Sequence, residues 1–216
     1  MMLILPIDHV IIPVADLAAT GAAFEAAGFV VTPEARHSAA MGTANRCIMF
    51  DRTYIELMGV VEETSANLPW RRAIKHGSGM GGLAFSTSNI QVTANDFKAR
   101  CIRTEALRHF SRQTNEGELR FSVIRIDPSE TPGFQCLVCE HHTRELLWRP
   151  ELLRHPNSVT SIEAIFLPSV EGLGRFGQQE GVAVMQGNSG LRLRGSRSAS
   201  YDLTSSCDIT IEVIAP

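Results

Sequence analysis

The first apolar stretch of the chain has the alternation of a strand with one buried face. Within residues 7–14, Val10, Ile12 and Val14 share one face, because side chains alternate along a strand, and His9 lies on the other face. Within residues 54–60 the same alternation places Glu56 opposite an apolar face. If both apolar faces pack on the helix between them and the strands are neighbours, the imidazole and the carboxylate form half of a metal site.

A helix is expected between these strands, over residues 17–27. Asp16 can accept a hydrogen bond from a free amide of its first turn, and Gly28 can take the positive φ that ends a helix. The remaining strands are expected at residues 29–31 and 46–50. Residues 1–62 then form one βαβββ module.

The same order of elements returns twice along the chain. A second module spans residues 80–146, and a third, shorter βαβββ-like module spans residues 158–216. The elements expected in the second module are a strand at 83–86, a helix at 93–101 and strands at 105–111, 119–126 and 134–142. Laid on the first module, Glu163 takes the place of His9 and Glu212 that of Glu56. The repeats predict an α+β fold, in which the third module completes a second site or forms a dimer interface.

The amino-acid composition limits which binding partners and which cellular compartment we expect. The chain has 216 residues, 44% of them hydrophobic and 20% charged, which is typical of an ordinary globular protein. A net charge of −3 argues against nucleic acid as the main partner. Five cysteines, an odd and sparse set, favour a reducing compartment, so we expect a cytoplasmic protein. The apolar residues 1–6 are too few to span a membrane and lack the features of a signal peptide.

Polar residues around the loop of the first module are candidates for binding a substrate. Arg36, His37 and Asn45 could anchor a carboxylate or a carbonyl oxygen, with the arginine as a bidentate donor. Ordinary loop polarity, with a turn at Asn45, explains the same residues. Both interpretations stay open at this point.

Three groups of motifs resemble a known family. They are Gly42-Thr43-Ala44-Asn45-Arg46, Tyr54-Ile55-Glu56-Leu57, and Trp148-Arg149-Pro150-Glu151 with His155-Pro156-Asn157. In this order and spacing they resemble the glyoxalase-like branch of the vicinal-oxygen-chelate superfamily, which contains glyoxalase I, extradiol dioxygenases and antibiotic-resistance binding proteins. The resemblance covers about the first 160 residues and implies curved mixed sheets that form a cup around a divalent metal ion.

The resemblance also implies a ligand set. His9 and Glu56 would be ligands from the first module, and Glu140 would be a ligand from the last strand of the second. Gly82 stands where a second histidine is often found. Because His142 shares a strand face with Glu140, it is a better candidate for the cup than His141. This mixed set suits Zn, Ni, Fe(II), Mn or Co.

Two classes of function follow for a small-molecule substrate or ligand. The first is a metal-dependent lyase, isomerase or dioxygenase, in which the metal polarises adjacent oxygens and Glu140 also acts as general base. The second is a metal-free protein that sequesters a ligand in the same cup, which Gly82 favours. The chain is expected to act without nucleic acid or membrane, and a homodimer is possible.

Overall fold

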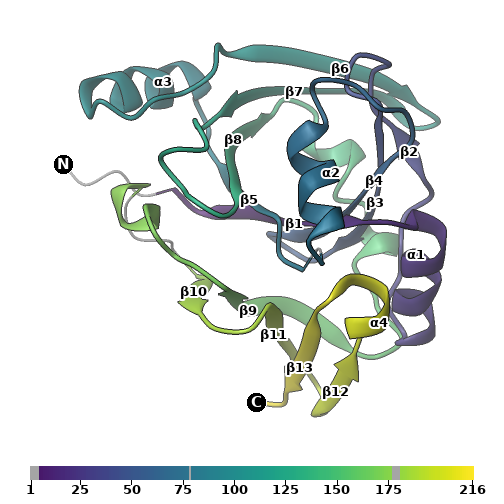
Figure 1. The fold of residues 1–216 in the computed structure, drawn as a ribbon. Coiled ribbons are helices and arrows are strands. Elements are labelled where there is room, and N and C mark those ends of the chain that lie inside the picture. The colour runs from purple at the N-terminus through teal and green to yellow at the C-terminus, as the bar shows by residue number, and fades with distance from the viewer. Residues whose placement is uncertain (1–4, 78, 177–180) are drawn as a thin grey trace.

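The fold was analysed in a computed structural model, which describes residues 5–77, 79–176 and 181–216 (Figure 1). The apolar residues 1–4 lie outside the described residues. The strands are β1 (Ile7–Val14), β2 (Ala35–Arg36), β3 (Thr43–Met49), β4 (Tyr54–Val60), β5 (Gly82–Ser86), β6 (Arg108–Thr114), β7 (Gly117–Arg125), β8 (Gln135–His141), β9 (Val159–Leu167), β10 (Ala183–Gln186), β11 (Gly190–Gly195), β12 (Ala199–Asp202) and β13 (Thr210–Ile214). The α-helices are α1 (Leu17–Ala26), α2 (Leu68–Lys75), α3 (Ile90–Ala99) and α4 (Thr204–Cys207). Short 3-10 helices are η1 (Arg144–Leu146), η2 (Pro150–Leu152) and η3 (Leu173–Phe176).

The first two modules join into one eight-stranded sheet within a single chain. Its strand order is β2-β3-β4-β1-β5-β8-β7-β6. β4 runs parallel to β1 and β8 runs parallel to β5, while β1 and β5 pair antiparallel where the modules meet. The sheet curls, so that residues of β2 and β6, from its two edges, line the same cavity (Figure 1). The predicted α+β fold with a curved mixed sheet that forms a cup is confirmed.

One face of the curled sheet carries the hydrophobic core. Val10 and Ile12 of β1, with Leu83 and Phe85 of β5, are fully buried in a cluster that also contains Phe24 of α1. Apolar residues of the five-stranded C-terminal sheet belong to the same cluster. The C-terminal sheet therefore covers the outer face of the cup. The candidate functional residues lie on the other, concave face.

The C-terminal sheet pairs its strands differently from the first two modules. Its order is β10-β9-β11-β13-β12, so its first strand β9 lies beside β10 and β11 and not beside the last strand β13. The 3-10 helix η3 lies between β9 and β10 along the chain. Glu163 forms an ion pair with Arg194 at 2.7 Å, and Glu212 forms one with Arg192 at 2.8 Å. The counterparts of His9 and Glu56 in this module are thus engaged with arginines of β11.

Local signals predicted the first helix well and one strand poorly. The Asp16 carboxylate accepts a hydrogen bond from the Ala19 amide at 2.8 Å, and Gly28 ends the helix region with φ +82°. The strand expected at residues 29–31 does not form. The Val30 amide donates to the Nδ1 atom of His155 at 2.9 Å, so a side chain from the segment between η2 and β9 replaces a strand partner.

The longest helices, α1 and α3, have ten residues each. Within the described ranges, no helix has the length and apolar character needed to cross a membrane.

Candidate functional site

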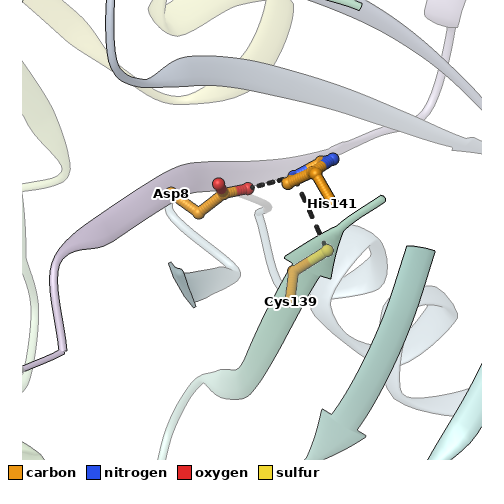
Figure 2. Close-up of side chains that lie close together, drawn as sticks. All are labelled: Asp8, Cys139 and His141. Atoms are coloured by element: carbon orange, nitrogen blue, oxygen red, sulfur yellow. Dashed lines mark hydrogen bonds and ion pairs between the residues drawn. The ribbon is translucent and has the colours of Figure 1, made fainter. Parts of the chain in front are cut away.

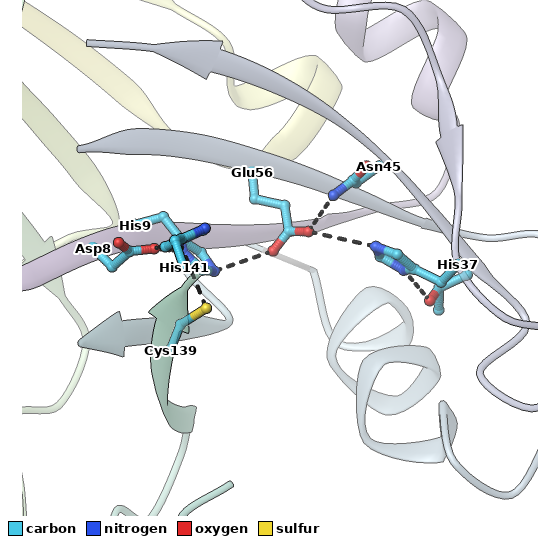
Figure 3. Close-up of polar contacts among 8 residues, drawn as sticks. Asp8, His9, His37, Asn45, Glu56, Cys139 and His141 are labelled. Carbon is cyan, nitrogen blue, oxygen red and sulfur yellow. Dashed lines mark hydrogen bonds and ion pairs between the residues drawn. The ribbon is translucent and has the colours of Figure 1, made fainter. Parts of the chain in front are cut away.

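His9 and Glu56 face each other on the concave side of the sheet. β1 and β4 are parallel neighbours, with Ile11 paired to Glu56. The Nε2 atom of His9 lies 3.4 Å from the Oε2 atom of Glu56, and both side chains are more than nine-tenths buried (Figure 3). The Tyr54 ring stacks on the His9 imidazole at 4.3 Å between centroids. The proximity expected from strand alternation is therefore present.

Asp8 completes this pair, although alternation alone assigns it to the opposite face. The pairing between β1 and β5 shifts between Ile7 and His9, which places an extra residue in β1. A β-bulge re-aims a side chain in this way. The fully buried Asp8 carboxylate accepts hydrogen bonds through Oδ2 from Nδ1 of His9 at 2.7 Å and from Nε2 of His141 at 3.0 Å.

Two predicted substrate-binding residues contact the other oxygen of Glu56. The amide of Asn45 donates to Oε1 of Glu56 at 2.6 Å. Nε2 of His37 lies 3.9 Å from the same oxygen, and Nδ1 of His37 shares a hydrogen bond of 2.7 Å with the Thr43 hydroxyl (Figure 3). The third predicted residue, Arg36, lines the cavity with a mainly exposed side chain that pairs with Glu34 at 3.6 Å.

The two histidines beside Glu56 have opposite shifts in pKa. Burial disfavours the imidazolium of His9, but hydrogen bonds to Asp8 and Glu56 outweigh it and raise the pKa of His9 to about 9. Burial dominates at His37 and lowers its pKa, and the positive charges of Arg112 and Arg125 add to that effect. His9 is therefore protonated at neutral pH, whereas the neutral form of His37 is favoured.

The carboxylates of the site are held in their charged form. Burial raises the pKa of Glu56, but the hydrogen bond and the charge of His9 outweigh it and lower that pKa to about 2. The pKa of Asp8 lies well below its usual range because hydrogen bonds from His141 and His9 outweigh its burial. The site thus holds an imidazolium between two carboxylates.

A cavity of about 170 Å³ opens beside this network. Aromatic and aliphatic side chains form most of its wall, among them Trp70 of α2, Phe110 of β6 and Phe121 of β7. Two arginines, Arg112 of β6 and Arg125 of β7, line it as well. The Nε and Nη1 atoms of Arg112 are buried and have no hydrogen-bond partner among the described residues.

The sequence interpretation of β8 needs a correction. Cys139 and His141 line the cavity, whereas Glu140 and His142, predicted as metal ligands, lie on the other face of the strand. The Glu140 carboxylate accepts a hydrogen bond from the amide of Ile90 at the start of α3, at 2.9 Å. Nε2 of His142 shares a hydrogen bond of 2.7 Å with the Ser122 hydroxyl. Both faces of β8 carry apolar residues, so alternation could separate the faces but could not show which one meets the core.

The second half of the sheet does not repeat the residues that the first half places at His9 and Glu56. Asp16 caps α1 about seven residues after His9, and Asn89 caps α3 the same distance after Gly82, so Gly82 is the counterpart of His9. His9 pairs with Tyr54, two residues before Glu56, and Gly82 pairs with Gln135, two residues before Leu137. Leu137 is therefore the counterpart of Glu56. Neither Gly82 nor Leu137 has a metal-binding side chain.

Comparisons with known proteins agree with this architecture. The model of the glyoxalase-like domain family matches residues 7–171, which include both halves of the eight-stranded sheet. No curated protein matches the sequence.

Solved structures show the fold at low sequence identity. A hypothetical protein from Staphylococcus aureus has a TM-score of 0.74 at 10% identity, over 98% of this chain and 100% of that chain. A Streptomyces coelicolor methylmalonyl-CoA epimerase in complex with 2-nitronate-propionyl-CoA has a TM-score of 0.52 at 20% identity, over 64% of this chain and 96% of that chain. A methylmalonyl-CoA epimerase in complex with methylmalonyl-CoA and NH4+ has a TM-score of 0.51 at 20% identity, over 64% and 95% of the two chains. With a family model that covers well over half of its length, the chain belongs to the glyoxalase-like domain family, within the glyoxalase superfamily.

Proposed function

We propose that the protein is an isomerase or lyase that moves a proton at a carbon atom next to a carbonyl group of a small anionic molecule. The observation that carries this proposal is the pair of histidines on either side of Glu56. The pKa of His9 is raised to about 9, and the pKa of His37 is lowered. Two groups in one cavity with pKa values pushed apart are suited to act as acid and base.

In the proposed reaction His37 is the base. Its Nε2 atom takes the proton as the carbon–hydrogen bond breaks, and the electron pair moves onto the carbonyl oxygen. Nε2 of His9 donates a hydrogen bond or a proton to that oxygen. An isomerase returns the proton of His37 to the neighbouring carbon, whereas a lyase expels a leaving group. Glu56 stays ionised, with Oε2 3.4 Å from Nε2 of His9. Its Oε1 atom lies 3.9 Å from Nε2 of His37, so its charge stabilises the imidazolium that forms when His37 takes the proton.

Two arginines that line the cavity indicate the class of substrate. Arg112 and Arg125 line the cavity, and buried nitrogen atoms of Arg112 lack a partner among the described residues. A carboxylate or phosphate satisfies such guanidinium donors well. A cavity of about 170 Å³ accommodates a small molecule. We therefore propose a compact substrate with a carbonyl group and an acidic group, such as a 2-oxo acid.

A divalent metal ion on the predicted ligands stays a prediction. The distance of 3.4 Å between His9 and Glu56 suits two ligands of one ion, but Gly82 and Leu137 supply no further donors. Because Glu140 and His142 lie on the other face, the predicted set of four residues does not fit one ion. The proposed acid–base steps accordingly use only side chains. The homodimer and the cytoplasmic location also remain predictions.

Deuterium exchange tests the proposal without the natural substrate. Pyruvate and longer 2-oxo acids are incubated with the protein in D2O, and loss of the proton signal next to the carbonyl is followed by NMR. We expect His37→Asn and His9→Gln to lower the exchange rate by about 10²- to 10⁴-fold, as for loss of a general acid or base. The matched controls Glu140→Gln and His142→Asn lie on the opposite face and should retain the wild-type rate. Equal rates in all four variants would disprove the acid–base assignment.

Binding without catalysis is the second candidate. It is supported by the largely apolar wall of the cavity and by Gly82 and Leu137 in place of ligands. In that case anionic ligands would quench the fluorescence of Trp70, which lines the cavity, while no ligand would exchange protons above the background rate.

A further inference from the structure

A second group of donor atoms lies beside the proposed proton-transfer residues. Oδ2 of Asp8 lies 3.0 Å from Nε2 of His141, and this nitrogen lies 3.6 Å from Sγ of Cys139 (Figure 2). The three donor atoms all lie within 4.8 Å of one another. Asp8 comes from the bulge in β1, and the other two residues come from the end of β8.

The spacing of these atoms matches the edges of a tetrahedral zinc site. Zinc binds oxygen, nitrogen and sulfur ligands at about 2.0, 2.0–2.1 and 2.3 Å, so neighbouring ligand atoms lie roughly 3.3–3.6 Å apart. The two distances at His141, 3.0 and 3.6 Å, lie close to this range. Small movements of the side chains would bring these two distances into that range.

The surroundings of the cluster support a cation. Asp8 is fully buried, and its Oδ1 atom has no hydrogen-bond partner among the described residues. A buried carboxylate oxygen without a donor is costly, and a metal ion would satisfy it. The Trp148 ring packs edge-on against His141 at 5.2 Å between centroids, which helps to fix the imidazole.

We propose that Asp8, Cys139 and His141 bind one Zn²⁺ ion whose fourth coordination position faces the cavity. Cys139 and His141 line the cavity, so a water molecule or a substrate oxygen can reach that position. A thiolate ligand selects zinc over magnesium, calcium or manganese, which prefer oxygen donors. This ligand set shares no residue with the set predicted from the sequence. His9 is not a ligand in it, but forms a hydrogen bond with the ligand Asp8.

Binding of zinc requires one proton to leave. The Cys139 thiol gives its proton to solvent as the sulfur–zinc bond forms. The hydrogen on Nε2 of His141, which that nitrogen donates to Asp8 without metal, moves through solvent to Nδ1 and frees the lone pair for zinc. No electron is transferred. The site shares the cavity with the proposed acid–base pair but does not depend on its function. Metal binding can therefore be measured without substrate, so failure of either proposal is recognised separately.

Cobalt substitution tests the site directly. The purified full chain is stripped of metal, titrated with Co²⁺ and followed by absorption spectroscopy, because a thiolate ligand to cobalt gives a charge-transfer band in the near ultraviolet. We expect one Co²⁺ per chain, this band, and its displacement by one equivalent of Zn²⁺. Cys139→Ser should remove the band, and Asp8→Asn and His141→Ala should weaken binding of cobalt at least 100-fold.

Two matched controls show whether the site is the proposed one. Cys136 lies on the same strand but in the hydrophobic core, so Cys136→Ser should keep the band. His142→Ala removes the imidazole next along the chain, on the other face, and should also keep it. Circular dichroism checks the folding of each variant. For wild-type protein, protection of Cys139 from alkylation by Zn²⁺ gives a readout without substitutions.

Three outcomes would overturn the proposal. They are wild-type protein that binds no Co²⁺ in a stoichiometric amount, bound Co²⁺ without a thiolate band, and a band that survives Cys139→Ser. Bound Co²⁺ that depends on His9 and Glu56 but not on Cys139 would place the ion at the pair predicted from the sequence instead.

Discussion

His9 and Glu56 form a buried ion pair across two parallel strands, with Nε2 and Oε2 3.4 Å apart. His9 also donates to Asp8 at 2.7 Å, so one imidazolium balances two carboxylates. Removal of one partner of a buried ion pair leaves an uncompensated charge and costs about 3–5 kcal/mol. We expect His9→Leu to lower the free energy of unfolding by that amount in urea denaturation. The exposed His76 is the control, and His76→Gln should change the free energy by less than about 0.5 kcal/mol.

The same pair makes stability depend on pH in a defined window. The pKa of His9 is raised from 6.5 to about 9, so its contribution is fully present below pH 6.5 and is lost as the pH rises through about 9. The pKa of Glu56 is lowered from 4.5 to about 2, so its contribution is present above pH 4.5 and is lost as the pH falls through about 2. Both contributions are complete between pH 4.5 and 6.5.

Thermal unfolding at pH 6 and near pH 9.5 measures how much His9 contributes to the pH dependence of stability. The midpoint of the wild-type protein should fall between these two conditions, and the fall should be smaller in His9→Leu. An equal fall in both proteins would show that other groups cause it.

The rate of proton exchange should have a bell-shaped dependence on pH. On the acid side it rises as His37, whose pKa is lowered from 6.5, loses its proton and becomes a base. On the alkaline side it falls near pH 9 as His9 loses its proton. Measurement of the deuterium exchange rate from pH 4 to 10.5 checks both limbs, and a profile without an alkaline limb would remove His9 as the acid.

Arg112 and Arg125 should determine the affinity for acidic ligands. A hydrogen bond to a charged group contributes about 1.5–3 kcal/mol, so Arg112→Leu and Arg125→Leu should each weaken binding of pyruvate by about 10- to 100-fold. Calorimetry or tryptophan fluorescence gives the dissociation constant. The neutral methyl ester should bind equally well to all variants. Arg120→Leu, at an exposed position of β7, is the matched control.

Gly82 should resist substitution because other groups occupy the space above it. A Cβ atom there would lie 2.8 Å from the carbonyl oxygen of Gln135 and 3.3 Å from the Trp70 ring. We expect Gly82→Ala to destabilise the protein by about 1–3 kcal/mol, as overpacking of a core does. Gly174→Ala, where nothing lies within 4 Å of the added atom, should be nearly neutral in the same urea denaturation experiment.

Local patterns along the chain predict the first helix and the strand faces that carry His9 and Glu56. Alternation gave β1 and β4 their faces, and Asp16 and Gly28 set the limits of α1, because these signals act between residues close in the chain. These faces bring His9 and Glu56 together because β1 and β4 are parallel neighbours, a pairing that alternation along one strand does not determine. The resemblance carried by the family motifs predicted the curled sheet, and the structure confirms it.

Long-range strand pairing selects the other side chains that lie beside His9 and Glu56. The bulge that turns Asp8 into the cup depends on the pairing of β1 with β5, and alternation along one strand cannot reveal it. The choice between the two faces of β8 depends on which one meets the core, and both faces are apolar enough to do so. Arg112 reaches the cavity because the sheet curls, and curvature is a property of all eight strands together. Long-range pairing and burial fixed these positions, whereas the sequence pattern fixed only what neighbours along the chain decide.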